Sequence, residues 1–274
     1  MKKHNIIAMA LTSLMALPVI AQDSTPAVGD ILQGINMFTP EEGDPAYKVK
    51  ANEKYGTQWG VDMAYGLWNT EKVSDVKRHN NLALLHAQLN QRLIEDKANG
   101  GTWLRVEFSG SWGLDRESAQ SDTFFTEAYA TASGLHADAM GPHEGIFPEV
   151  ALMQYFAGKR ACLIAGMVNL TNYFDAVSIA NDSFSSFTND GFVNSTILPL
   201  VDSNIGGILQ VELNRNNYMM VAVSRTGCDS GYNPFNSDYC DGYAVVGEYG
   251  HIFADGAATL RINPFSVSYT HLTL

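Results

Sequence analysis

Apolar and polar residues alternate along most of the chain from residue 57 onward. In 84–93 and 103–112 the apolar side chains share one face, which carries Leu85, Ala87, Leu89, Leu93, Leu104, Val106, Phe108, Gly110 and Trp112. The opposite face carries Leu84, His86, Gln88, Asn90, Arg92, Trp103, Arg105, Glu107, Ser109 and Ser111. A period of two is that of a β-strand with one dry and one wet face. A helix would scatter the charges of 103–112 around its axis.

The same pattern predicts ten strands, at 57–68, 84–93, 103–112, roughly 123–131, 149–157, 160–169, 205–213, 217–225, 243–253 and 257–263. Four short turn signals separate some of them, at 96–101, 157–160, 214–217 and 254–256. Longer connections lie between the others, at 113–122, 132–148, 170–204 and 226–242. An alternation of short turns with long loops is typical of bacterial outer-membrane barrels.

Strand length favours the same class. Most of the predicted strands have the about 9–11 residues of a tilted membrane strand, whereas soluble strands average about 5–6. Aromatic residues stand near strand ends, where a membrane interface favours them: Trp59, Trp68, Trp103, Trp112 and Phe253. Soluble β-sandwiches also carry aromatic residues there. We therefore predict an all-β, antiparallel transmembrane β-barrel, with a soluble sandwich as the alternative.

Both ends of the chain differ from this pattern. Residues 1–21 have two early lysines, an apolar run and a small-residue triplet ending at Ala21, as in a cleaved signal peptide; a membrane anchor is the alternative. Residues 22–56 are rich in Pro, Gly and charge and predict an extended periplasmic leader. The terminal "SVSYTHLTL" resembles a translated adaptor sequence, so 266–274 is expected to be a non-native tail. The predicted barrel domain is therefore 57–265, and it is incomplete.

The net charge of the chain narrows the range of possible binding partners. Without Lys2 and Lys3 the 17 basic residues become 15, against 29 acidic ones, which makes the net charge −14. An anionic body argues against binding nucleic acid and against a pore selective for anions. Neutral or cationic solutes remain.

The cysteine residues, and the residues that could bind a metal ion, suggest little further chemistry. Cys228 and Cys240 bracket a turn-rich loop and are a candidate disulfide, while Cys162 lies in an apolar run and is expected to be an inert thiol. Oxygen ligands for Ca²⁺ occur in 175–190, but their spacing does not fit an EF-hand, and such residues also serve as turn formers. No metal site and no cofactor are predicted.

Catalysis has equally little support. His136 and His143 lack the spacing of a zinc-protease helix, and no G-x-S-x-G turn or phosphate-binding glycine loop occurs. Asp115 and Glu117 are a conceivable glycosidase pair, but a sequence does not reveal their separation. We predict that the protein is not an enzyme and has no catalytic residues.

The stretch 149–199 carries a family resemblance. It reads "EVALMQYFAGKRACLIAGMVNLTNYFDAVSIANDSFSSFTNDGFVNSTILP", with successive short steps at Gly166 to Asn169, Phe174-Asp175, Ala180-Asn181-Asp182, Phe187 to Asn189 and Asn194 to Pro199. These steps, and "NIGGILQVELNRNNYMMVAVSRT" further on, resemble the central region of the carbohydrate-selective porin (OprB) family. The resemblance covers about 149–263 and is more diffuse at 57–113. Members of that family are thought to form barrels of about sixteen strands.

The resemblance implies a bacterial outer-membrane protein that passes sugars or other small neutral solutes by facilitated diffusion and contacts outer-membrane lipid. It also allows a homotrimer, because large porins are often trimers. A sugar pore needs charged and amide groups that exchange hydrogen bonds, with aromatic rings for the sugar to slide over. Charge on the lipid face would be costly, so the polar face should line the channel. The candidate lining residues are His86, Gln88, Asn90, Arg92, Trp103, Arg105 and Glu107.

The loop after 160–169 is the candidate constriction. It contains five aromatic residues, Tyr173, Phe174, Phe184, Phe187 and Phe192, which could pack a plug against the wall. The constriction candidates are Tyr173, Phe174, Asp175, Asn181, Asp182, Asn189 and Asp190. Two alternatives stay open: a general diffusion porin whose charges merely line a water-filled pore, and a secreted glycan-binding β-sandwich.

Overall fold

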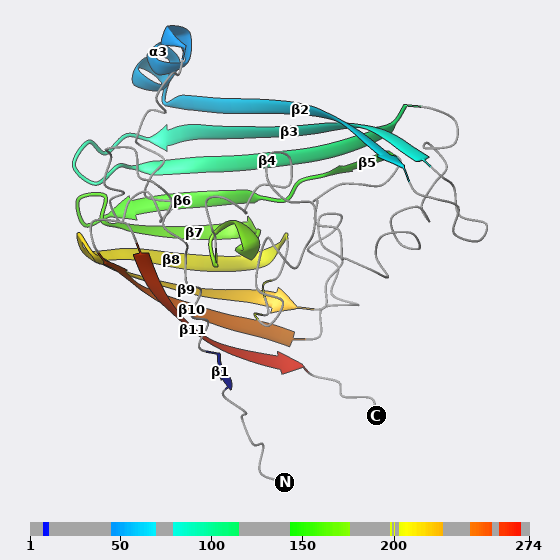
Figure 1. The fold of residues 1–274 in the computed structure, drawn as a ribbon. Helices are drawn as coiled ribbons and strands as arrows, with labels where there is room; N and C mark the ends of the chain where they lie inside the picture. The colour runs from blue at the N-terminus through cyan, green and yellow to red at the C-terminus, as the bar shows by residue number, and fades with distance from the viewer. Residues whose placement is uncertain are drawn as a thin grey trace.

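A computed structural model shows one large β-sheet (Figure 1). It describes residues 8–10, 45–69, 79–114, 143–175, 198, 200, 203–226, 242–253 and 258–269. The strands are β1 (Ala8–Ala10), β2 (Thr57–Asn69), β3 (His79–Ile94), β4 (Thr102–Gly113), β5 (His143–Ile146), β6 (Val150–Phe156), β7 (Ala161–Val168), β8 (Asn204–Asn214), β9 (Asn217–Thr226), β10 (Gly242–Phe253) and β11 (Ala258–Tyr269). A helix, α3 (Ala46–Tyr55), precedes β2, and a 3-10 turn, η3 (Leu170–Asn172), follows β7.

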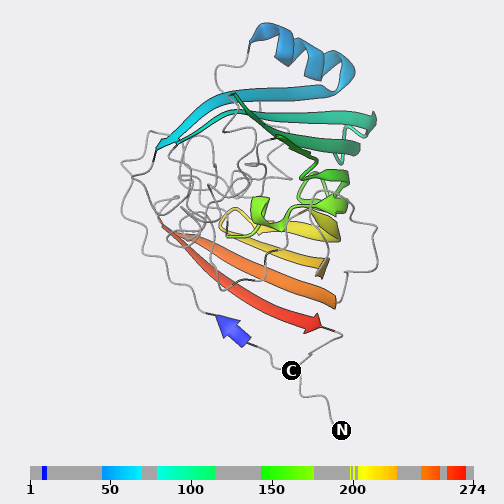
Figure 2. The same cartoon turned by 90° about the vertical axis from the view of Figure 1, so that its right-hand side faces the viewer.

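Every strand pair is antiparallel, in the order β1-β11-β10-β9-β8-β7-β6-β4-β3-β2, with β5 also paired to β4. This confirms the all-β, antiparallel prediction. Figure 2 shows that the sheet curls, with η3 on its concave side. Among the described strands, β2 pairs only with β3 and so forms one edge of the sheet.

The connections differ sharply in length at the two ends of the strands. At one end they are short: 95–101, 157–160, 215–216 and 254–257. At the other end they are 70–78, 114–142, 169–203 and 227–241. We call the first end the short-turn end. Helix α3 lies there too, because it leads directly into the start of β2 (Figure 1).

The two faces of the sheet have opposite character. Large apolar side chains on the convex face are exposed, among them Trp59, Val61, Met63, Tyr65, Leu67, Leu89, Leu152, Phe156, Leu163, Met219, Val221, Val223, Tyr243 and Val245. Register places them in continuous rows, such as Trp59 beside Leu89 and Leu89 beside Val106. The concave face is buried and mixed. It combines apolar groups such as Met153, Ile164 and Ile208 with the charged or polar Arg105, Glu107, Gln210, Glu248 and Asn263.

Residues 46–55 correct the prediction of an extended leader, because they form a helix. The segment contains good helix formers, Ala, Lys and Glu. It stops at Gly56, which takes the left-handed conformation (φ 65°) and donates its N–H to Asn52 O. A Cβ at Gly56 would lie 2.4 Å from Arg92 Cβ. No helix within the described residues is long and apolar enough to cross a membrane.

Other boundaries differ from prediction in smaller ways. The predicted strand at 123–131 lies outside the described residues, and β5 was not predicted. Strand β11 continues to Tyr269, past the expected end of the domain at 265. Three residues of the predicted signal peptide, β1, pair with β11.

The β3–β4 turn offers a test of the fold. Gly101 has φ +81°, and a Cβ there would lie 2.1 Å from Ile94 O. We expect Gly101→Ala to lower the free energy of unfolding by about 1–3 kcal/mol, because the strained conformation and the clash add. Urea unfolding followed by tryptophan fluorescence measures the change. Gly60→Ala is the control, since a Cβ at Gly60 meets nothing within 4 Å; equal losses in both variants would contradict the turn geometry.

Candidate functional site on the concave face

Strand β4 supplies the first two charged groups of the site, Arg105 and Glu107. They are two residues apart, so both side chains project to the concave face. Both are nearly fully buried, at 6% and 3% exposed. Arg105 donates a hydrogen bond to Glu107 in an ion pair. A buried ion pair is stable only with good geometry and further hydrogen bonds, because removing the two charges from water is costly.

A bulge between β5 and β6 supplies the third group, Glu149. Ser109 pairs with Ile146 and Val106 with Val150, so the β5–β6 side has one extra residue. Pro148, which has no N–H to donate to a ladder, lies in this break. Glu107 N donates to Glu149 O at 2.8 Å, which fixes the bulge against β4. The Glu149 side chain is fully buried and faces Arg105, with 3.6 Å between Arg105 Nε and Glu149 Oε1.

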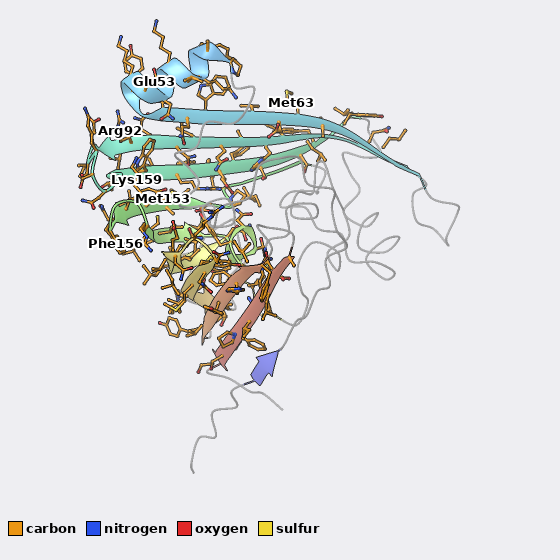
Figure 3. The ribbon with its side chains drawn as sticks, turned by 60° about the vertical axis from the view of Figure 1, so that its left-hand side comes forward. Glu53, Met63, Arg92, Met153, Phe156 and Lys159 are labelled. Carbon is orange, nitrogen blue, oxygen red and sulfur yellow. The ribbon has the colours of Figure 1, made fainter. Side chains whose placement is uncertain are left out.

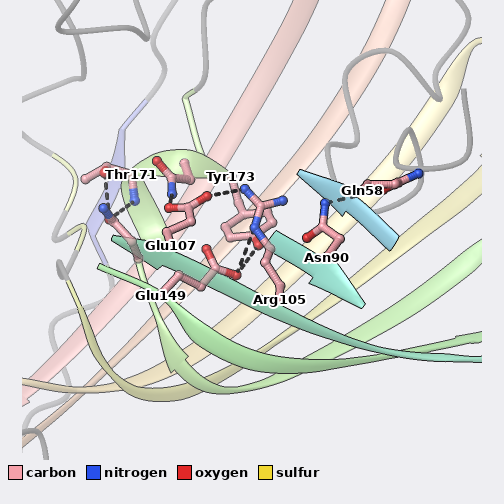
Figure 4. Close-up of polar contacts among 9 residues, drawn as sticks. Gln58, Asn90, Arg105, Glu107, Glu149, Thr171 and Tyr173 are labelled. Carbon is pink, nitrogen blue, oxygen red and sulfur yellow. Dashed lines mark hydrogen bonds and ion pairs between the residues drawn. The ribbon is translucent and has the colours of Figure 1, made fainter. Parts of the chain in front are cut away.

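Gln88 on β3 completes what we call the Arg105 cluster, namely Gln88, Arg105, Glu107 and Glu149 (Figure 4 draws its charged members). With its amide oxygen turned toward the guanidinium, Gln88 accepts from Arg105 Nη2 at 2.8 Å. The cluster holds two carboxylates and one guanidinium. The carboxylate oxygens therefore outnumber what one guanidinium can bind and need further hydrogen-bond donors.

Those donors come from residues 169–175, which we call the inner segment. Asn169 Oδ1 caps η3 by accepting from Thr171 N at 3.1 Å and from Thr171 Oγ1 at 2.6 Å. Asn172 Nδ2 then donates to Glu107 Oε2 at 3.0 Å, and the Tyr173 hydroxyl donates to Glu149 Oε1. Figure 4 shows these contacts converging on Arg105, whose guanidinium carbon lies 5.8 Å from the centre of the Tyr173 ring.

Burial keeps Tyr173 in its donor form. Tyr173 is 1% exposed, and desolvation raises its pKa well above the usual value. The hydroxyl therefore keeps its proton at neutral pH and can donate to a carboxylate. Leu170 and Phe174, both 0% exposed, flank this polar contact with apolar side chains.

A second cluster lies on strands β9, β10 and β11. Glu248 accepts from the Tyr218 hydroxyl at 2.6 Å and from Asn263 Nδ2 at 2.8 Å, and Arg261 Nε lies 3.8 Å from its Oε1. We call these four residues the Glu248 cluster. The backbone N–H of Asp175 donates to Glu248 Oε2 at 3.1 Å. The inner segment therefore contacts carboxylates of β4 and β10.

Several of the predicted lining residues come together here. Gln88, Arg105 and Glu107 belong to one cluster with Tyr173, a predicted constriction residue. Asn90 lies nearby on the same face of β3 and donates to Gln58 Oε1 at 3.4 Å (Figure 4). The prediction that these side chains share one face is confirmed by register.

The remaining candidates lie elsewhere. His86 shares the concave face of β3 but belongs to neither cluster. Arg92 and Trp103 lie at the short-turn end, where Trp103 Nε1 donates to Gly100 O at 2.8 Å. Phe174 and Asp175 belong to the inner segment. Asn181, Asp182, Asn189, Asp190, Cys228 and Cys240 lie outside the described residues. Cys162, the predicted inert thiol, is a buried free thiol on β7.

The sequence prediction missed the residues that complete both clusters. Glu248 had a signal: it is the one charged residue of β10, and alternation places it with Ala244 and Val246. Glu149 also had one, because the period of the predicted strand 149–157 places it with Ala151 and Met153, which are buried on the concave face. Asn172 belongs to a segment that has no period from which to infer contacts.

Five buried polar atoms on or beside this face have no hydrogen-bond partner within the described part of the chain: Asn90 Oδ1, Glu149 Oε2, Asn169 Nδ2, Arg261 Nε and Asn263 Oδ1. Buried polar atoms ordinarily bond to protein, water or ligand. Both acceptors and donors are present, which suits water and hydroxyl-bearing solutes, since a hydroxyl can play either role. No group of three or more His, Cys, Asp or Glu residues suited to a metal occurs in the described ranges.

Comparison with known proteins adds one short similarity. No protein-family model and no solved structure matches the chain. A stretch of 68 residues is 37% identical to part of a protein of Aquifex aeolicus (strain VF5) that is described only as uncharacterized. The match spans 24% of this chain and 22% of that protein.

The contact between the inner segment and Glu149 can be tested by removing one hydroxyl. We expect Tyr173→Phe to lower the free energy of unfolding by about 1–3 kcal/mol, because a buried carboxylate loses a donor. Tyr243→Phe is the matched control, since Tyr243 is 59% exposed on the convex face. Both changes are measured by urea unfolding. If the control lost as much stability as Tyr173→Phe, the docking of the inner segment on Glu149 would be refuted.

Proposed function

We propose that this chain forms the wall of an outer-membrane β-barrel porin through which small neutral sugars diffuse. One observation carries the proposal: the exposed face of the sheet is apolar and the buried face holds the charges. Soluble proteins show the reverse, and large contiguous apolar patches on a protein surface indicate contact with lipid or another protein.

The charged residues of the strands lie almost entirely on the concave face. By register, Asp62, Arg92, Arg105, Glu107, Glu212, Glu248 and Arg261 share the concave face. Arg225, the penultimate residue of β9, is the one charged residue that register assigns to the convex face among strand residues with described side chains. A cation at the midplane of the lipid face would cost about 2–4 kcal/mol, falling to about 0–1 near the interface. Arg225, the one charged residue on the convex face, therefore lies near a strand end, where the cost of a charge is small.

Strand lengths support a membrane wall as well. Six strands (β2, β3, β4, β8, β10 and β11) have between 11 and 16 residues. That is at or above the about 9–11 residues that a tilted strand needs to cross the hydrocarbon core. A soluble glycan-binding sandwich would need a second sheet to cover the convex rows. The described residues contain one sheet, which favours the membrane reading over the sandwich.

The concave face suits a neutral, hydroxyl-bearing solute. Guanidinium, carboxylate and amide groups lie close together in the two clusters, and these are the kinds of group with which a sugar hydroxyl exchanges hydrogen bonds. The inner segment adds the ring of Tyr173 to this face. The contacts of a channel must also be weak enough to release the solute. Dispersed amide groups and paired charges meet that requirement better than a single unpaired charge does. A general diffusion porin remains the runner-up.

Channel recordings test the proposal. The native full-length protein, incorporated in a planar bilayer, is expected to conduct ions, and added glucose should reduce the current in a saturable way. Poly(ethylene glycol) of matched size should reduce it only as far as it lowers bulk conductivity. A current insensitive to glucose would favour the general porin. A protein that fractionates as soluble and never conducts would favour the sandwich.

A variant connects the sugar effect to the concave face. Asn90 is 8% exposed, and its Oδ1 has no partner in the described residues. We expect Asn90→Ala to raise the glucose concentration for half-maximal block about five-fold, the equivalent of one hydrogen bond of about 1 kcal/mol. Asn81→Ala makes the same change on the convex face of β3 and should leave the block unaltered. An equal change in glucose block in the two variants would show that the concave face does not bind the sugar.

A further inference from the structure

The short-turn end of the sheet carries an excess of basic residues. Helix α3 and the short connections 95–101, 157–160 and 215–216 contain seven basic residues and three acidic ones. We call these four segments the short-turn rim; its cations are Lys48, Lys50, Lys54, Lys97, Lys159, Arg160 and Arg215. The four long connections of the sequence contain 14 acidic and four basic residues. A chain of net charge −12 thus has one cationic end.

Helix α3 presents most of this charge. Tyr47, Lys50 and Lys54 are spaced i, i+3 and i+7, which places them on one face of the helix. All three are exposed, Tyr47 at 61%. None of the ten helix residues is buried. Because no residue of this helix is buried, its cationic and aromatic outward face is available to another partner.

Trp59 connects the helix to the apolar convex face. It begins the convex row of β2 and is 42% exposed. The Lys48 ammonium lies 4.7 Å from the centre of the indole ring, and the Tyr47 ring centre lies 6.3 Å from it. Tryptophan and tyrosine favour the level of the lipid headgroups. The cations of α3 therefore stand where the hydrophobic face ends.

Hydrogen bonds from strand β3 fix the helix in this position. Gln91 Nε2 donates to Tyr55 O at 3.1 Å, and Arg92 N donates to Gly56 O at 2.8 Å. These bonds continue the β2–β3 ladder into the helix C-terminus. The charges of α3 are thus held relative to the sheet.

The neighbouring turns continue the cationic rim around the end of the sheet. Figure 3 shows Glu53, Arg92 and Lys159 at the same end of the strands. The Lys97 side chain is 87% exposed. Arg160 donates to Leu213 O at 2.6 Å, which links two adjacent turns of the rim.

We propose that the short-turn rim binds the phosphate groups of anionic phospholipids in the adjoining membrane leaflet. This inference rests on the proposed function, since it requires the convex face to lie in a bilayer. Charge complementarity supports it, because basic residues beside a membrane are attracted to anionic headgroups. Continuity with the convex face through Trp59 supports it too.

The test uses spin-labelled lipids. The full-length protein is reconstituted in phosphatidylcholine bilayers with a trace of spin-labelled phosphatidylglycerol or spin-labelled phosphatidylcholine, and electron spin resonance gives the association constant of each probe. We expect a preference for phosphatidylglycerol that weakens in 0.5 M NaCl, because salt screens exposed charge. Lys50→Gln and Lys54→Gln should each reduce the preference, by up to about five-fold at the site affected.

Two controls separate charge at the rim from other causes. Arg225→Gln removes one positive charge from the convex face at the opposite end and should leave the preference unchanged. Lys50→Arg/Lys54→Arg keeps the charge and should retain it. Equal association of both probes with the wild-type protein, or an equal loss in Arg225→Gln, would overturn the lipid site alone. A protein that immobilises neither probe because it does not enter the bilayer would overturn the proposed function and the lipid site with it.

Discussion

The structure depends on how three buried carboxylates are stabilised on one face of a sheet. Glu107, Glu149 and Glu248 are 0–3% exposed, and two guanidinium groups, Arg105 and Arg261, face them. Three carboxyl groups outnumber two guanidinium groups, so ion pairing alone does not satisfy the buried carboxyl oxygens. Tyrosine hydroxyls, amides and a backbone N–H supply the missing stabilisation. Each of the three carboxylates receives one of these donors from the inner segment, so this loop is part of the charge balance of the sheet.

Regular structure was predictable from the sequence because a strand has a simple period. Nine of the predicted strands coincide with described ones to within a few residues, apart from the longer β3 and β11. The direction of Arg105 and Glu107 followed from the same period. The inward direction of Glu149 followed from it too, because Glu149 has the parity of the buried Ala151 and Met153. Its contact with Arg105 was not predictable, because that contact depends on the pairing of β4 with β6. Residues 46–55 were assigned to an extended leader because Pro, Gly and charge dominate their surroundings. The stop signal at Gly56 was the overlooked indication of a helix.

The same alternation that buries charge on one face leaves the other face uniformly apolar. A free-standing sheet of this kind would aggregate through its convex rows. A lipid environment removes that hazard, and in it the polar backbone groups must pair within the sheet. The free edge of β2 is the place where this pairing is incomplete among the described strands. Under the proposed function, the backbone groups of this edge would also have to be paired.

Curvature of the sheet follows from the contacts of the inner segment. Strands β4 and β10 are five strand spacings apart in the sheet order, about 24 Å on a flat sheet. From Asn172, which bonds Glu107, to Asp175, which bonds Glu248, the chain advances three residues, or about 6 Å in a 3-10 turn. Side chains stand roughly perpendicular to a sheet and add little reach along it. One short segment can contact both carboxylates only if the sheet curls toward it, as Figure 2 shows. The segment therefore both requires the curvature and helps to hold it.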